Sequence, residues 1–280
     1  MKSTLNPPRR GRKSRETPGS KNGKEAGIVY LMYHELESPG RLLCQSEPGY
    51  VRYVILETAF RAQMDCVQSM GWRGVNVSDA LTSPIPSSVA ITFDDGCETD
   101  LLSAAPILKG INFGATFYLT VGFLGKPGYM SPAQVRQLAD LGFEIGCHSM
   151  SHPYLTDLDR DGMRQELAAP KEVLEQLIGR GIKHFSCPGG RWNARVAEAA
   201  REAGYQSVAT SRNSANSAKT HAYCLGRVAI KRNMDLSIFG RICHGQGLWR
   251  LQLADVAALA AKRVMGNTGY DAIRGLLLHK

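Results

Sequence analysis

Short apolar segments rich in β-branched residues alternate with segments of helical periodicity along most of this chain. Strands that alternate with helices predict a parallel sheet, because each helix returns the chain to the edge where the next strand begins. We expect strands at Ile28–Tyr33, Gly74–Val77, Val89–Phe93, Ala115–Leu119, Phe143–Cys147, His184–Cys187, Gln206–Ala209 and Cys224–Ile230. We expect helices at Thr58–Met70, Thr99–Lys109, Ser131–Leu141, Gly162–Ile178 and Asn193–Ala203. About seven or eight such units predict an α/β fold, a distorted TIM-like (β/α) barrel, with an open doubly wound sheet as the alternative.

Local signals mark the ends of several of these helices. Ser131 followed by Pro132 predicts an N-cap and a first turn, where the missing N–H of proline costs nothing. Four glycines stand where left-handed C-caps are expected, namely Gly71, Gly110, Gly142 and Gly204.

Charge and composition divide the chain into three parts. Residues 1–27 hold eight Lys or Arg side chains against two Glu and no apolar run, which predicts a disordered basic tail. Residues 28–230 form the expected folded domain, and residues 231–280 a helical extension with apolar spacing at Leu251–Val264 and Tyr270–Leu278. The net charge of +9 lies mostly in the tail, and the body has no stripe of basic and aromatic side chains. We therefore expect no nucleic-acid partner, and a peripheral contact of the tail with an anionic membrane surface.

The location of the protein is constrained by what the chain lacks. No segment has the roughly 18–20 uninterrupted apolar residues that cross a bilayer, and the basic start is not followed by the apolar core of a secretory signal. The seven cysteines are widely spaced and form no C-x-x-C pair, which argues against a disulfide framework and against a zinc knuckle. We expect a cytoplasmic, membrane-peripheral protein.

Two adjacent carboxylates follow the strand expected at Val89–Phe93. Asp94-Asp95-Gly96 stands at the carboxyl end of that strand, where parallel α/β folds place their active sites. Neighbouring side chains on an extended chain point in different directions, so one Asp can bind a metal while the other faces a water beside it. The alternative is ordinary turn chemistry.

Histidines follow two other expected strands. His148 and His152 come after Phe143–Cys147, and two imidazoles four residues apart can converge with a carboxylate on one metal ion. His34 follows the first strand and is expected at the same end of the barrel. For each histidine alone, the alternative is a side chain that caps a turn or packs in the core.

A glycine-rich turn follows the strand expected at His184–Cys187. Gly189 and Gly190 expose backbone N–H groups near a helix start, and such groups can stabilise a developing oxyanion. The alternative is a tight strand-to-helix turn without a catalytic role.

Two of these motifs together resemble one protein family. Thr92-Phe93-Asp94-Asp95-Gly96 followed by His148-Ser149-Met150-Ser151-His152-Pro153 resembles the polysaccharide deacetylase family, also called NodB-homology or carbohydrate esterase family 4. The resemblance covers residues 28–230. The opening Met32-Tyr33-His34, with the Phe60–Met64 helix and Gly71-Trp72, is similar to the permuted branch that acts on poly-N-acetylglucosamine-type exopolysaccharides.

The resemblance implies a role for each motif residue. It implies that Asp95, His148 and His152 bind a divalent metal, zinc first, with cobalt, nickel or manganese as alternatives. It implies that Asp94 is the general base and His34 the general acid, with the Gly189 or Gly190 N–H at the oxyanion.

The third motif of the family departs from its usual form. The family usually has Arg-x-Pro-Tyr/Phe-Gly there, whereas this chain has Ser186-Cys187-Pro188-Gly189-Gly190, so the arginine that orients the base is missing. Arg191 is the candidate that takes its place. Leu277-Leu278-His279 superficially fits the family's last motif, but it lies in a segment of helical periodicity, so we prefer His34 as the acid.

The function expected from these features is a metal-dependent hydrolase that removes N-acetyl groups from a polysaccharide or a sugar precursor. One alternative is a hydrolase of another amide, such as a cyclic imide or ureide. The other is a catalytically inactive sugar-binding subunit of exopolysaccharide synthesis, which would have no need of two carboxylates and two imidazoles at strand ends.

Overall fold

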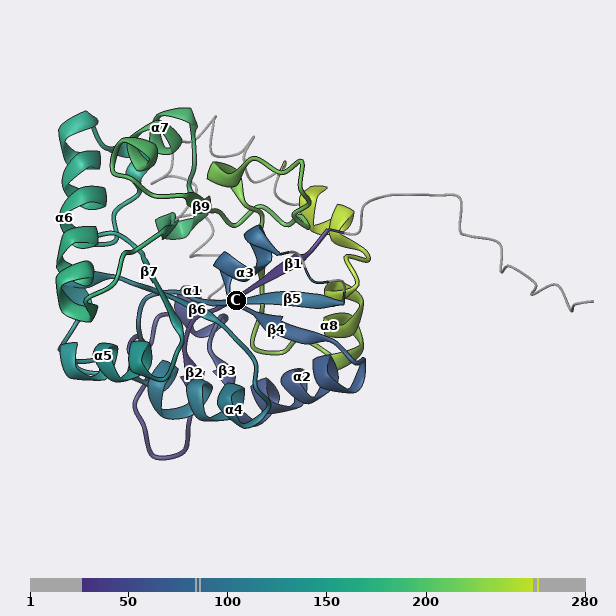
Figure 1. Cartoon of the computed structure of the whole chain (residues 1–280). Coiled ribbons are helices and arrows are strands. Elements are labelled where there is room, and N and C mark those ends of the chain that lie inside the picture. The colour runs from purple at the N-terminus through teal and green to yellow at the C-terminus, as the bar shows by residue number, and fades with distance from the viewer. Residues whose placement is uncertain (1–26, 84, 86, 254–255, 257–280) are drawn as a thin grey trace, which may run out of the picture.

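The computed structural model describes residues 27–83, 85, 87–253 and 256. In this part of the chain eight parallel strands form one sheet, ordered β10-β1-β5-β6-β7-β8-β9, with β4 also paired to β5 (Figure 1). The strands are β1 (Val29–Tyr33), β4 (Arg73–Val75), β5 (Ser88–Phe93), β6 (Thr116–Leu119), β7 (Glu144–Cys147), β8 (His184–Ser186), β9 (Ser207–Ala209) and β10 (Val228–Ala229). Each of the eight expected strands is therefore present, and all of the pairings are parallel.

The segment before β10 closes the sheet on itself. Leu225 bridges Ala209 at the end of β9, and the Thr210 N–H donates to the Leu225 carbonyl at 2.9 Å. A few residues later β10 pairs with β1, through Leu31 and Val228. Residues 225–229 thus connect the last strand to the first, and the prediction of a distorted (β/α) barrel is confirmed.

Helices cover the outside of this barrel (Figure 1). They are α2 (Glu57–Ser69), α4 (Ala105–Gly110), α5 (Pro132–Asp140), α6 (Arg160–Ile178), α7 (Ala194–Glu202) and α8 (Leu236–Cys243). The expected helix at Thr99–Lys109 differs in its first half, because Asp100–Ala104 forms a π-helical turn that leads into α4. The sequence did not predict four short elements, namely β2 (Leu36–Glu37), α1 (Pro48–Val51), β3 (Ile55–Leu56) and α3 (Val77–Thr82).

The predicted helix ends are largely confirmed. Ser131 and Gln134 form a reciprocal capping box at the start of α5. Gly71, Gly142 and Gly204 have positive φ angles after their helices. Gly110 does not, because it is the last residue of α4 and the left-handed position is Asn112, with φ 57°.

The strand expected at Cys224–Ile230 is much shorter than predicted. Ala222–Cys224 is a 3-10 turn, and only Val228–Ala229 is a strand. The reason is the side chain of Asn216, whose amide accepts from the Gly226 N–H and donates to the Gly226 carbonyl, both at 2.8 Å. These bonds satisfy the backbone that a longer ladder would have paired.

The two ends of the chain are described only in part. The expected basic tail lies outside the described residues except for Gly27, and so do the segment Tyr270–Leu278, the His279 alternative and most of Leu251–Val264. Beyond α8, residues 248–253 are helical. Among the described helices, none combines the length and the apolarity that a bilayer span requires.

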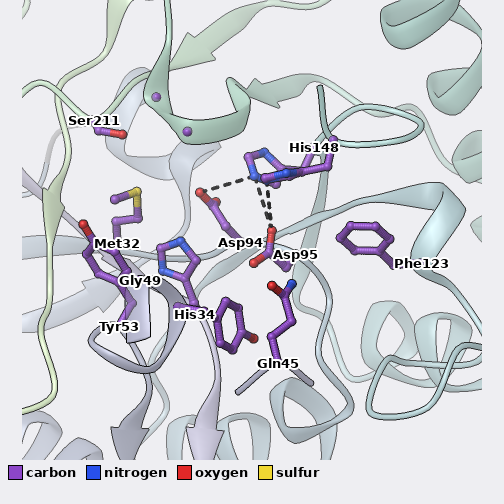
Figure 2. A pocket seen from close by; sticks show the side chains of 14 residues that line it. Met32, His34, Gln45, Gly49, Tyr53, Asp94, Asp95, Phe123, His148 and Ser211 are labelled. Atoms are coloured by element: carbon purple, nitrogen blue, oxygen red, sulfur yellow. Dashed lines mark ion pairs between the residues drawn. The ribbon is translucent and has the colours of Figure 1, made fainter. Parts of the chain in front are cut away.

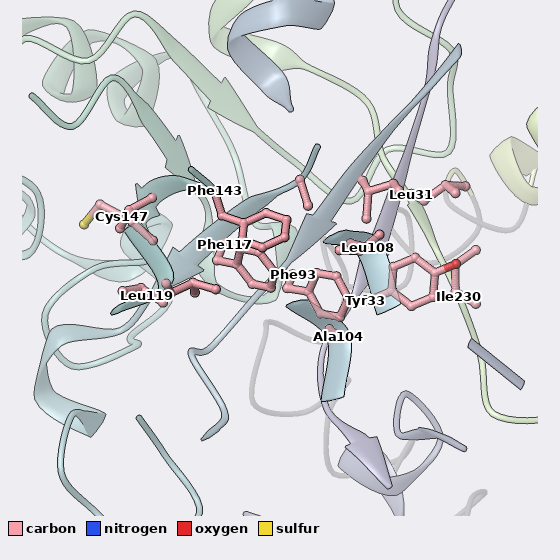
Figure 3. Close-up of a cluster of buried hydrophobic side chains, with 14 of the residues drawn as sticks. Leu31, Tyr33, Phe93, Ala104, Leu108, Phe117, Leu119, Phe143, Cys147 and Ile230 are labelled. Carbon is pink, nitrogen blue, oxygen red and sulfur yellow. The ribbon is translucent and has the colours of Figure 1, made fainter. Parts of the chain in front are cut away.

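The main core lies between the sheet and its helices, and a ladder of aromatic rings runs through it (Figure 3). Tyr33, Phe93 and Phe117 stack with ring centroids 5.2 and 4.9 Å apart, and Phe143 meets Phe117 edge-on at 5.4 Å. Because side chains alternate between the two faces of a strand, the residues adjacent in sequence to these core residues point into the barrel. Met32, Thr92 and Asp94 therefore face the interior.

One glycine inside the barrel lets two strands approach closely. A Cβ at Gly146 would lie 2.4 Å from the ring of Tyr118, so β7 can pack against this tyrosine only without a side chain there. This packing fixes the start of the loop that follows β7.

A buried polar cluster stabilises the opposite, amino-terminal end of the barrel. The Glu144 carboxylate accepts from the Val77 N–H at 3.1 Å and from the Thr116 hydroxyl at 2.5 Å, and it lies 3.4 Å from Nε2 of His184. Burial alone would raise the pKa of Glu144, but the hydrogen bond and the charge of His184, with the hydroxyls of Ser78 and Thr116, lower this pKa to about 2.

This cluster predicts a loss of stability in acid. A carboxyl whose pKa is lowered from 4.5 to about 2 on folding contributes stability that is complete above pH 4.5 and is lost as the pH falls toward 2. The difference corresponds to about 3 kcal/mol of unfolding free energy. Urea unfolding should show that wild type has a larger unfolding free energy than Glu144→Gln at pH 7, and that this difference is smaller at pH 3. Glu172→Gln, on an exposed position of α6, is the matched control. A difference in unfolding free energy between wild type and Glu144→Gln that does not depend on pH would contradict the prediction.

Candidate active site

A pocket opens at the carboxyl ends of the barrel strands, where the sequence places its motif residues (Figure 2). His34 follows β1, Asp94 and Asp95 follow β5, and His148 follows β7. The lining residues are Met32, His34, Gln45, Gly49, Tyr50, Tyr53, Asp94, Asp95, Phe123, His148, His152, Gly189, Gly190 and Ser211. Seven of the eight site residues expected from the sequence therefore line one pocket, and Arg191 follows directly after Gly190.

Asp95, His148 and His152 bring three potential metal ligands together. One ligand atom of each lies within 4.8 Å of the other two. Asp95 Oδ1 is 3.5 Å from Nε2 of His148 and 3.5 Å from Nε2 of His152. Asp95 and His152 both have left-handed backbone conformations, with φ 79° and 66°. Such strain in non-glycine residues occurs often at functional sites.

The chemistry of these three residues fits a divalent cation. Asp95 Oδ1 is buried and has no hydrogen-bond partner among the described residues. Nδ1 of His148 lies 2.8 Å from the Ser186 carbonyl, so its proton is directed there and the Nε2 lone pair is directed toward Asp95. Burial lowers the pKa of His148 to about 3, which keeps this imidazole neutral, as a ligand must be. Burial raises the pKa of Asp95 to about 6, because it makes the charged form of the carboxyl unfavourable. A bound cation would stabilise the charged form.

A glutamate from α6 holds the loop that carries the two histidines. Oε2 of Glu166 accepts from the N–H groups of Met150 and Ser151 at 2.9 and 2.8 Å, and Oε1 accepts from the Ser151 hydroxyl at 2.6 Å. The positions of His148 and His152 therefore depend on a helix outside the barrel.

Asp94 is paired with a buried arginine that sequence reasoning missed. Nη1 and Nη2 of Arg227 donate to the two carboxylate oxygens at 2.7 and 2.8 Å, in a bidentate pair. Both side chains are buried, with relative exposures of 0% for Arg227 and 2% for Asp94. Burial alone would raise the pKa of Asp94, but the Arg227 guanidinium holds it well below its usual range. Asp94 is thus ionised and fixed in orientation.

The missing arginine of the third motif is replaced from elsewhere in the chain. Ser186 stands where that motif usually begins, and its hydroxyl donates to Asp94 at 3.2 Å and accepts from Arg227 at 2.7 Å. Arg191, the candidate from the sequence, instead has its guanidinium 4.2 Å above the ring of Tyr154. A signal for Arg227 was present in the sequence, because a lone arginine inside an expected apolar strand must find a buried partner.

His34 lies in the same pocket, near Asp94 and Asp95 in Figure 2. Its ring stacks on Tyr53 at a centroid distance of 5.2 Å. Nδ1 of His34 is buried and has no hydrogen-bond partner among the described residues. The ring is therefore held mainly by stacking, with a nitrogen left for a ligand.

The two glycines expected at an oxyanion differ in their hydrogen bonds. The Gly190 N–H donates to the Cys187 carbonyl at 2.8 Å within the turn, so this donor is already used. A Cβ at Gly190 would lie 1.7 Å from the Ser211 hydroxyl, so the glycine is needed for packing. The Gly190 N–H is therefore not available to an oxyanion, which leaves Gly189 as the candidate donor.

Comparison with known proteins shows the same relationship that the motifs indicate. The family model described as polysaccharide deacetylase matches residues 82–208. The putative polysaccharide deacetylase YxkH of Bacillus subtilis is 28% identical over 226 residues, which cover 79% of this chain and 77% of that protein. A peptidoglycan-N-acetylglucosamine deacetylase of Bacillus cereus is 33% identical over 121 residues, which cover 43% of this chain and 54% of that protein.

Solved structures share the fold. The Streptococcus pyogenes deacetylase PplD, in complex with acetate, superposes with a TM-score of 0.70 at 22% identity, covering 78% of this chain and 98% of that chain. IcaB from Ammonifex degensii superposes with a TM-score of 0.65 at 23% identity, covering 78% of this chain and 97% of that chain. Residues 82–208, which carry the Asp94-Asp95 and His148–His152 motifs, match the polysaccharide deacetylase family model, so this part of the chain is a polysaccharide deacetylase domain.

Proposed function

We propose that this protein is a metal-dependent hydrolase that removes N-acetyl groups from an N-acetylglucosamine-containing polysaccharide or sugar precursor. One observation carries the proposal: Asp95, His148 and His152 converge within 4.8 Å beside the anchored carboxylate of Asp94, and His34 lines the same pocket. The names of the relatives supply the class of substrate. The permuted branch remains part of the proposal, supported by His34 after the first strand and by the shared fold of IcaB.

The proposed chemistry assigns one task to each side chain. Asp95, His148 and His152 hold the divalent ion, which supplies Lewis-acid polarisation of the acetamide carbonyl and activation of water. Asp94 accepts a proton from the attacking water, with Arg227 keeping the carboxylate oriented. The Gly189 N–H donates to the oxygen that becomes negative in the tetrahedral intermediate.

His34 completes the reaction. Protonated His34 donates to the amine nitrogen as the carbon–nitrogen bond breaks, so that acetate and a free amine leave. Its stacking on Tyr53 places the ring at the pocket wall, where it can reach a substrate bound against Asp94.

We propose zinc as the ion, with cobalt, nickel or manganese as alternatives. Two imidazoles and one carboxylate with open positions form a ligand set typical of catalytic zinc and of other first-row metals. The metal content of purified protein, measured by atomic absorption, distinguishes between these ions.

The test is acetate release from N-acetylglucosamine oligomers by metal-stripped protein, before and after addition of zinc or cobalt. We expect release only after addition, and we expect His148→Ala to lose both the bound ion and the activity. His221→Ala, at an exposed position, is the matched control. A protein that binds the ion at Asp95, His148 and His152 but hydrolyses a cyclic imide rather than the oligomers would contradict the proposed substrate.

A further inference from the structure

Two cysteine side chains meet beside the pocket, and the proposed mechanism uses neither. Sγ of Cys44 lies 3.4 Å from Sγ of Cys97. Cys97 directly follows Asp94-Asp95-Gly96 and is buried, whereas Cys44 is half-buried on the segment between β2 and α1. The two residues are 53 positions apart in the sequence, so the fold alone brings them together.

The segment that carries Cys44 forms one wall of the pocket. We call residues 38–47 the wall loop. Gln45 on this loop, and Gly49 and Tyr50 just after it, line the pocket. At its start, the wall loop is held by the Ser38 hydroxyl, which donates to Glu57 at 2.8 Å, and Arg41 forms an ion pair with Glu98. Near Cys44 the side-chain contacts are weaker: the Cys44 thiol donates to the Gly128 carbonyl at 3.1 Å, and the Gln45 amide donates to the Tyr129 hydroxyl at 3.1 Å.

Glu35 is the third potential ligand near the two sulfurs, but its oxygens are already engaged. They accept from the Cys44 N–H at 3.0 and 3.1 Å and from the Tyr50 hydroxyl at 3.0 Å. The sulfur–sulfur distance of 3.4 Å is also shorter than the about 3.8 Å that separates two thiolates on a tetrahedral zinc ion with bonds of about 2.3 Å. Bonding between the sulfurs therefore fits the arrangement better than a shared metal.

We propose that Cys44 and Cys97 form a reversible dithiol–disulfide site that fastens the wall loop to the end of β5. The oxidant is a disulfide RSSR, either of a small thiol or of a thiol–disulfide oxidoreductase. Half-buried Cys44 attacks RSSR as its thiolate and releases one RS⁻. The Cys97 sulfur then displaces the second RS⁻ from Cys44, and the two thiol protons end on the two RSH molecules.

The chemical test measures the cross-link directly. Reduced full-length protein is incubated with oxidised glutathione, denatured, alkylated, digested and analysed by mass spectrometry. We expect a peptide pair joined through Cys44 and Cys97, and five alkylated cysteines instead of seven, because the cross-link blocks two of the seven free thiols. Dithiothreitol should restore all seven. Cys44→Ser should abolish the cross-link, whereas Cys66→Ser, at a half-buried cysteine on α2, should leave it intact.

A second measurement tests the tether without using enzymatic activity. Trypsin cleavage after Arg41, on the wall loop, should be several-fold slower in the oxidised protein than in the reduced protein, and equally fast in both preparations of Cys44→Ser. Equal rates in oxidised and reduced wild type would overturn the tether.

Two further results would overturn the disulfide itself. One is alkylation of Cys44 without any cross-link after prolonged oxidation. The other concerns the His148→Ala variant, in which the proposed ion site of Asp95, His148 and His152 is disrupted. If this variant still binds zinc and loses it when Cys44→Ser is added, the two thiols bind a metal rather than each other. Both results are independent of whether the protein releases acetate.

Discussion

Asp94→Asn should lower acetate release by about 10²–10⁴-fold, the range that a positioned general base contributes. Asparagine has nearly the same shape and accepts a hydrogen bond from Arg227, but its amide cannot accept the proton of the attacking water. Bound metal should stay at the wild-type level, because Asp95, His148 and His152 are unchanged. The measurement is kcat on N-acetylglucosamine oligomers, together with metal content.

Asp65→Asn, at an exposed position of α2, is the control for this substitution. It removes a carboxylate without touching the pocket, so its activity should equal that of wild type. If Asp94→Asn retains most of its activity with the ion bound, another group must be the base.

Arg227→Met should reduce the unfolding free energy by about 3–5 kcal/mol, the usual cost of removing one partner of a buried ion pair. The guanidinium donates to both oxygens of Asp94, to the Ser186 hydroxyl and to the Thr210 carbonyl, and the carboxylate would be left buried without its counter-charge. Such a loss is a large fraction of the 5–15 kcal/mol that is typical for a domain. Urea unfolding measures it, with Arg241→Met on the exposed side of α8 as the control.

A double-mutant cycle distinguishes a specific pair from general damage. Each single substitution leaves one buried charge uncompensated, whereas Asp94→Asn combined with Arg227→Met removes both charges. The double variant should therefore lose clearly less stability than the two single losses added together. If the double variant loses as much unfolding free energy as the two single variants together, the interaction between Asp94 and Arg227 contributes little to stability.

The eight parallel strands and the positions of most site residues could be predicted from the sequence, for a physical reason, although the order of the strands could not. Parallel strands with helices between them bring all carboxyl ends to one face, so any residue just after a strand is placed there. His34, Asp94, Asp95 and His148 follow this rule, and their motif spacing indicated the family.

The parts that could not be predicted depend on contacts between distant segments. Arg227 is 133 positions from Asp94, and no local pattern specifies that pairing. Gly190 could be recognised as a turn residue. That its N–H donates to the Cys187 carbonyl within the turn depends on the local backbone conformation, which the sequence does not specify. The short strands β2 and β3 have only two residues each, too few for a periodic signal.

The closure of the barrel has a consequence for the order of events during synthesis. The segment that joins β9 to β1 also carries Arg227, the partner of Asp94. When synthesis has reached about residue 200, Asp94, Asp95, His148 and His152 are already present. The sheet is still open at that point, and the Asp94 carboxylate has no arginine partner. Catalytic competence should therefore appear late and abruptly as the chain emerges, together with the completed barrel.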